Sequence, residues 1–122
     1  MKLSILEGVY NIHRLAPQST VPDLSQQLFY SVTQSVAELS VVCLDSIPIN
    51  AEKTESDWRV IEVAGPLEFN LTGVIAKLSA VLAEAGISIF VISTFDTDYV
   101  MLKTEKLELA KRVLESNNNR FE

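Results

Sequence analysis

The chain has 122 residues, 48% of them hydrophobic and 21% charged, a composition typical of a globular protein and too apolar for a disordered one. Ten basic and 16 acidic residues leave a net charge of −6, and this averaged field repels the phosphates of nucleic acids and anionic lipid headgroups. We therefore expect no nucleic-acid partner. No segment approaches the roughly 18–20 apolar residues that span a bilayer, so we also expect no membrane partner and a cytoplasmic location.

The first half of the chain is predicted to form mainly strands. Apolar and β-branched residues favour strands in three segments, at about 3–14, 28–34 and 39–44. A short helix of about residues 22–28 is expected between the first two segments. The strand pattern stops at residues 46–57, where Pro48 and a mixed-charge run separate the two halves. We predict an N-terminal unit, a linker and a C-terminal unit, at residues 1–50, 51–57 and 58–122.

The second half alternates strands and helices. Residues 58–64 have strand composition, and Gly65-Pro66 ends that strand because proline cannot donate to a sheet ladder. Apolar residues at helical spacing predict a helix from about residue 74 to residue 85. Three elements follow in chain order: a buried strand over residues 87–93, a strand over residues 99–103 and a helix that begins after residue 104.

This β-α-β-β-α order is one strand short of a ferredoxin-type split βαβ fold of the α+β class. Because only residues 120–122 remain after the last helix, we expect another part of the chain, or another subunit, to complete the sheet. A shift of 60 residues superposes the strand pair of residues 30–42 on that of residues 90–102, which indicates a degenerate internal repeat.

Two loops carry the residues that are suited to binding a ligand. At the first, the backbone amides of Gly73, Val74 and Ile75 open a helix, and such a helix start suits a carboxylate. The alternative interpretation is an ordinary strand-to-helix connection, capped by the side chain of Asn70 or Thr72.

The second loop is the turn before the last strand. Asp96 and Asp98 are the only carboxylates between Glu84 and Glu105. With Asp98 close to the helix start, the two loops would offer opposite charges to the two ends of an amino acid. The alternative is that both aspartates only accept local backbone N–H bonds, which we expect of Asp96 and leave open for Asp98.

Catalytic and metal sites are not predicted. His13 is the only histidine and lies in an apolar stretch without a triad-like arrangement, so we interpret it as structural. Cys43 is the only cysteine, which excludes an internal disulfide, and its apolar neighbours indicate a buried thiol. No phosphate-binding or dinucleotide motif occurs, so we expect no cofactor, no metal and no enzyme activity.

The stretch of residues 58–114 resembles the ACT domains, in particular the subfamily of small bacterial proteins and CASTOR-type arginine sensors. The resemblance is carried by VAGPLEFNLTGVIAKLSAVLAEAGISIFVIS and the following STFDTDYVMLK. The combination of LTG-V-I at the helix start with ISTFxTDY after the second strand is more specific than either motif alone. The first half resembles a degenerate partner ACT unit and lacks the LTG-type helix start.

The resemblance implies a ferredoxin-like βαββαβ fold in two ACT-like units, with antiparallel sheets and helices on one face, used in side-by-side pairs that hold an amino acid between them. It implies ligand contacts at six loop positions: Asn70, Leu71, Thr72, Gly73, Val74 and Ile75. Thr94 and Phe95 would line the pocket, and Asp98 would face a basic side chain such as a guanidinium. A small polar residue from the partner unit completes the family's site, and we identify no counterpart here.

These features predict a non-catalytic regulatory module, as a homodimer, that binds an amino acid or a similar small metabolite. The alternative is an assembly module that binds no ligand and whose pocket is filled by Phe69, Phe95 and Tyr99. An enzyme built on the same scaffold is a third interpretation, which no residue recommends.

Overall fold

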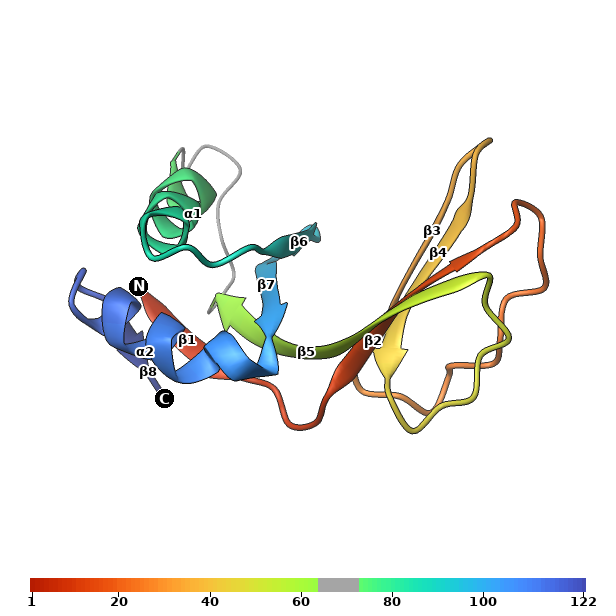
Figure 1. The fold of residues 1–122 in the computed structure, drawn as a ribbon, viewed down its shortest axis with the longest axis horizontal. Coiled ribbons are helices and arrows are strands. Elements are labelled where there is room, and N and C mark those ends of the chain that lie inside the picture. Colours follow the sequence, from red (N-terminus) through yellow and green to blue (C-terminus); the bar gives the residue numbers. More distant parts are fainter. Residues whose placement is uncertain (64–72) are drawn as a thin grey trace. The chain divides into compact units, whose positions relative to one another are not determined.

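The computed structural model describes residues 1–63 and 73–122 (Figure 1). The chain divides into two compact units, which we call unit 1, Met1–Glu7 with Arg59–Glu122, and unit 2, Gly8–Trp58. The expected unit boundaries and the ACT-like character of the N-terminal unit stay predictions. Within the described ranges, no helix is long and apolar enough to cross a membrane.

Unit 1 is a sheet with two helices. Its strands are β1 (Lys2–Ile5), the second part of β5 (Lys53–Val63), β6 (Phe90–Ser93), β7 (Asp98–Lys103) and β8 (Arg120–Phe121), in the order β6-β7-β5-β1-β8. The helices are α1 (Val74–Glu84) and α2 (Leu107–Glu115), the latter after the 3₁₀ turn η1 (Thr104–Lys106). The two helices and the β6–β7 hairpin match the sequence prediction within a few residues, and the α+β ferredoxin-like fold is confirmed.

The sheet of unit 1 is completed within the chain. β1 pairs antiparallel with β5, with Leu3 opposite Val63, and β8 pairs in parallel with β1. The expectation that another part of the chain completes the sheet is confirmed by β1, whereas residues 120–122, for which no strand was predicted, form β8 by pairing with the edge of β1. The parallel β1–β8 pair also departs from the expected all-antiparallel sheet.

The core of unit 1 explains why both helices lie on one face of the sheet. Leu78 and Leu82 of α1 are spaced four residues apart and are both buried. They belong to one apolar cluster with Ile87, which lies between α1 and β6, and with residues of α2 and of the strands: Leu3, Ile61, Val63, Val100, Leu102, Leu107, Ala110 and Leu114. Because the strand members alternate along β5 and β7, they share the face that the helices cover.

Leu3→Ala tests whether the N-terminal strand belongs to this core. Leu3 is 1% exposed, and truncating a fully buried leucine costs about 2–5 kcal/mol in the free energy of unfolding. We expect faster hydrogen exchange of the α2 amides in this variant. Leu28→Ala is the control, because that side chain is fully exposed and its loss should change stability by less than about 0.5 kcal/mol. Equal effects of the two substitutions would contradict the packing of β1.

Unit 2 is a four-stranded antiparallel sheet in the order β3-β4-β2-β5, formed by β3 (Ser31–Gln34), β4 (Leu39–Leu44), β2 (Tyr10–Leu15) and the first part of β5. Residues 53–57, expected in a linker, are strand residues: Thr54 pairs with His13 across β2 and β5. The predicted strand over residues 3–14 is interrupted at Gly8, which has a φ of 95° and where a Cβ would lie 2.5 Å from a side-chain carbon of Leu44.

The short helix predicted at residues 22–28 is absent from the described structure of unit 2. Asp23 instead accepts hydrogen bonds from the backbone N–H and the hydroxyl of Ser25, at 3.0 and 2.7 Å. These local bonds compete with helical ones and stabilise a turn. Leu24 remains buried, in a small core with Leu15, Leu39, Val41 and Cys43. Cys43 is fully buried, as expected, and this burial raises the pKa of its thiol.

His13 is buried in unit 2 and has a structural role, as the sequence indicates. A 2.9 Å hydrogen bond joins its Nδ1 to the hydroxyl of Thr54, whereas Nε2 has no hydrogen-bond partner in the described structure. Burial lowers the pKa of His13 below its usual value of 6.5, because the charged ring would lose its hydration. The folded state therefore favours the neutral imidazole.

This burial predicts a specific loss of stability in mild acid. As the pH falls below about 6.5, the unfolded chain binds a proton at His13 before the folded chain does, so the free energy of unfolding decreases. Urea denaturation between about pH 5 and 7 should show this slope, since carboxylates titrate mainly below that window. In His13→Gln the slope should disappear, because the chain then has no histidine. A slope that persists in this variant would contradict the assignment.

Candidate functional site

The start of α1 is the first part of the candidate site. Gly73 precedes the helix with a φ of 83°, a left-handed conformation that glycine adopts without steric cost, and its carbonyl accepts the N–H of Lys77 at 2.9 Å. Val74 and Ile75 pack their side chains against the core of unit 1. Their contribution to a ligand would therefore come from backbone amides. The predicted positions Asn70, Leu71 and Thr72 lie outside the described residues.

The turn between β6 and β7 is the second part. Thr94 closes it: its N–H and its hydroxyl both donate to the Thr97 carbonyl, at 2.9 and 3.0 Å, and its hydroxyl accepts the Thr97 N–H at 3.2 Å. Phe95 and Asp96 are left exposed at the tip. Side-chain hydroxyls that bond to nearby backbone groups in this way fix the shape of a turn.

Thr97 connects this turn to strand β5. It is 8% exposed, and its hydroxyl donates to the carbonyl of Val63, the last described residue of β5 before the helix start. Strand β5 thus contacts the turn at the point where the chain leaves the sheet toward α1. The sequence interpretation missed Thr97. The signal was present as a second threonine three residues after Thr94, because a pair with this spacing favours a turn closed by hydroxyls.

Asp98 occupies the helix-covered face of the sheet. It is half-buried at the first position of β7, opposite Ser93. Side chains alternate along a strand, so Asp98 shares its face with Val100 and Leu102, which contact the helices in the core. Two parts of the predicted ligand site, Asp98 and the start of α1, therefore lie on the same side of the sheet.

Tyr99 lies on the opposite face of β7. Burial and, secondarily, the negative charge of Glu62 raise the pKa of the Tyr99 hydroxyl. Phe95 is 76% exposed, which does not match the alternative expectation that it fills the pocket together with Tyr99. Phe69, the third aromatic residue of that alternative, lies outside the described residues.

The polar groups of this candidate site are suited to contacts with a charged ligand. Asp98 can accept hydrogen bonds from a cationic group, and the first amides of α1 can donate to an anion. In the part of the chain that the structure describes, no group of three or more His, Cys, Asp or Glu side chains is arranged to hold a metal ion.

Comparison with protein families matches a model of the ACT domain to residues 53–116. The chain belongs to the ACT domain family. A second family model, of an N-terminal domain, matches residues 8–50. The resemblance inferred from the sequence is thereby confirmed.

Three relatives illustrate the range of similar proteins. The cytosolic arginine sensor for mTORC1 subunit 1 of Pongo abelii is 26% identical over 92% of this chain, which spans 37% of that protein's length. A crystal structure of an Agrobacterium tumefaciens protein has a TM-score of 0.89 and 33% identity, over 99% of this chain and 91% of that one. The regulatory subunit of aspartate kinase from Thermus thermophilus, at 14% identity, shares the fold with a TM-score of 0.63, over 93% and 95% of the two chains.

Thr97→Val tests the connection between the turn and β5. The substitution keeps the shape of the side chain and removes the hydroxyl, leaving the Val63 carbonyl without this donor. We expect a loss of about 1–3 kcal/mol in the free energy of unfolding. Thr33→Val is a control, because Thr33 is exposed. Amide NMR shifts in the turn should change in Thr97→Val alone, and an unchanged turn would contradict a positioning role.

Proposed function

We propose that this chain is a non-catalytic ACT-type regulatory module that binds an amino acid with a basic side chain. The observation that carries the proposal is the position of Asp98, half-buried on the helix-covered face of β7 beside a turn that Thr97 fixes to β5. A carboxylate held in this way would meet a guanidinium or ammonium group with little loss of side-chain entropy.

The remaining contacts of the proposed ligand follow from the helix start. The amides of Gly73, Val74 and Ile75 would bind the α-carboxylate, because the N-terminus of a helix carries about half a positive charge. Asn70, Leu71 and Thr72 would complete this loop, and Thr94 and Phe95 would line the side-chain pocket. The arginine-sensor relative supports a basic amino acid as the ligand.

We further propose that the module acts in the cytoplasm as a homodimer, with the ligand held where two ACT units meet. Its relative is named as a cytosolic sensor, which supports the location. A ligand that contacts both partners shifts the association equilibrium by its preference for the paired state. Binding alone would then perform the regulation.

Assembly without a ligand is the second candidate function. It is favoured by the exposure of Val91, 37%, on β6 and of Phe95 in the adjoining turn. In the described structure β6 pairs only with β7, so its other edge is open to a partner strand. Under this function no amino acid would change the oligomeric state.

Asp98→Asn tests the proposed ligand by calorimetry with arginine and its neutral isostere citrulline. The substitution removes a charge while keeping the shape of the side chain, so arginine should bind about 10-fold to 100-fold more weakly. Citrulline, which is expected to bind weakly to the natural protein, should be little affected.

Asp96→Asn is the matched control, since it removes the same charge two residues away at the exposed tip of the turn. If the two variants lose arginine affinity equally, Asp98 has no specific role. If arginine does not bind the natural protein, and sedimentation shows the same oligomer with and without every amino acid, assembly alone is the function.

A further inference from the structure

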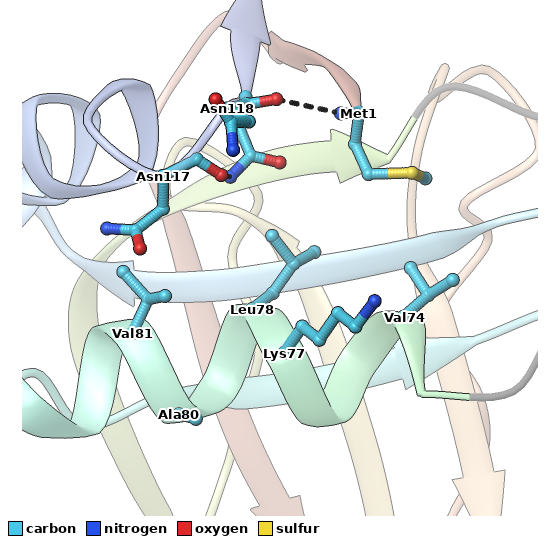
Figure 2. Close-up of a pocket in the computed structure, with 9 residues that line it drawn as sticks. Met1, Val74, Lys77, Leu78, Ala80, Val81, Asn117 and Asn118 are labelled. Atoms are coloured by element: carbon cyan, nitrogen blue, oxygen red, sulfur yellow. Dashed lines mark hydrogen bonds between the residues drawn. The ribbon is translucent and has the colours of Figure 1, made fainter.

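A second candidate site is a cavity in unit 1 that is lined neither by Asp98 nor by the turn before it. It has a volume of about 540 Å³ and opens between α1 and the turn of residues 117–119 that joins α2 to β8 (Figure 2). Cavities of about 300–1,000 Å³ are typical of small-molecule sites. None of Thr94, Phe95 and Asp98 lines it. Val74 lines the cavity and its amide also belongs to the proposed amino-acid site, so the two sites adjoin at the start of α1.

Strand β1 is inserted between β5 and β8 in the sheet of unit 1. Met1, which directly precedes β1, lines the cavity between α1 and the turn after α2.

The charges around the cavity favour an anion. Lys77 of α1 is the one charged side chain among the described residues that line it, and no carboxylate does so, although the chain has 16 acidic residues. The ion pairs between described residues do not involve Lys77, and its ammonium group can donate charge-assisted hydrogen bonds to an anion.

The three asparagines of the turn have different roles. Asn117 and Asn119 use their side-chain Nδ2 groups to hold the turn, donating to the carbonyls of Val113 at 2.8 Å and Leu114 at 3.0 Å. Asn118 has a φ of 67°, and its carboxamide makes no hydrogen bond to a described residue. The Asn118 carboxamide can therefore donate a hydrogen bond to a ligand, and it lies across the cavity from α1 (Figure 2).

The wall between these polar groups is apolar. Val74, Leu78 and Val81 lie on one side of α1 and line the cavity with carbon atoms, as Figure 2 shows. A ligand with an aliphatic body would remove this surface from water, at about 25 cal/mol per Å². A cationic group on the same ligand would meet no carboxylate among the described lining residues, which favours a ligand without an ammonium group.

We propose that this cavity is a binding site for a small aliphatic carboxylate without an ammonium group. Lys77 and Asn118 bind the carboxylate from opposite sides, and Val74, Leu78 and Val81 contact the aliphatic chain. The proposal does not depend on the amino-acid site at Asp98.

The test is an amide NMR titration of the full chain with hexanoate, hexylamine and norleucine, which share a six-carbon chain. Hexanoate should shift the amides of α1 and of residues 117–119, and the other two probes should not. Lys77→Met keeps the length of the side chain and should weaken hexanoate binding about tenfold or more, as expected for a charge-assisted hydrogen bond. Lys53→Met, which removes the same charge from the exposed start of β5, is the control.

Two further variants test whether hexanoate binds inside the cavity and independently of Asp98. Ala80→Phe should fill the cavity from an exposed position on α1 and abolish the shifts, while its NMR spectrum reports that the chain is folded. Asp98→Asn should leave hexanoate binding unchanged even where it weakens arginine binding. If hexylamine binds as well as hexanoate, if the shifts fall outside α1 and residues 117–119, or if Lys77→Met binds like Lys53→Met, the proposal is wrong.

Discussion

The pairing of β1 with the second part of β5 is the interaction on which unit 1 depends. It places Leu3 opposite Val63, and both side chains are buried beneath the two helices. Leu3 and Val63 are far apart in the sequence, so the contact between them carries the entropic cost of closing a long loop. The buried apolar surface of the core offsets that cost. Strand β1 also gives β8 an edge to pair with.

The same end of β5 positions the candidate ligand site. The side chain of Val63 packs in the core while its carbonyl accepts the hydroxyl hydrogen of Thr97, so one residue joins the core to the turn that precedes Asp98. A turn held only by its own hydrogen bonds would sample several positions relative to α1. The buried Thr97 bond removes that freedom, and preorganisation of this kind increases affinity without adding a ligand contact.

The sequence predicted the elements whose signals are local. Leu78 and Leu82 have helical spacing, and residues 39–44 are apolar except for Ser40, so α1 and β4 were placed within a residue or two. It did not predict β8, because two residues form a strand only when a neighbouring edge exists. It also did not predict the bond between Thr97 and Val63, residues 34 positions apart, since single-sequence patterns contain no information about such a contact. Asp98 stays a prediction as a ligand-binding residue, and its position on the helix-covered face became apparent only from the structure.

Helix α1 is common to both proposed sites, and this has a thermodynamic consequence. Its first amides would bind the amino acid, while Val74, Lys77 and Leu78 on its flank line the second cavity. Only two charged residues, Lys77 and Glu84, occur in this helix, so its position depends mainly on apolar packing, which a ligand on either side can shift by small amounts. If one ligand changes the position of α1, it changes the affinity for the other, and linkage requires the effect to be equal in both directions. An anionic metabolite at the second cavity would then tune the response to the amino acid without competing for Asp98.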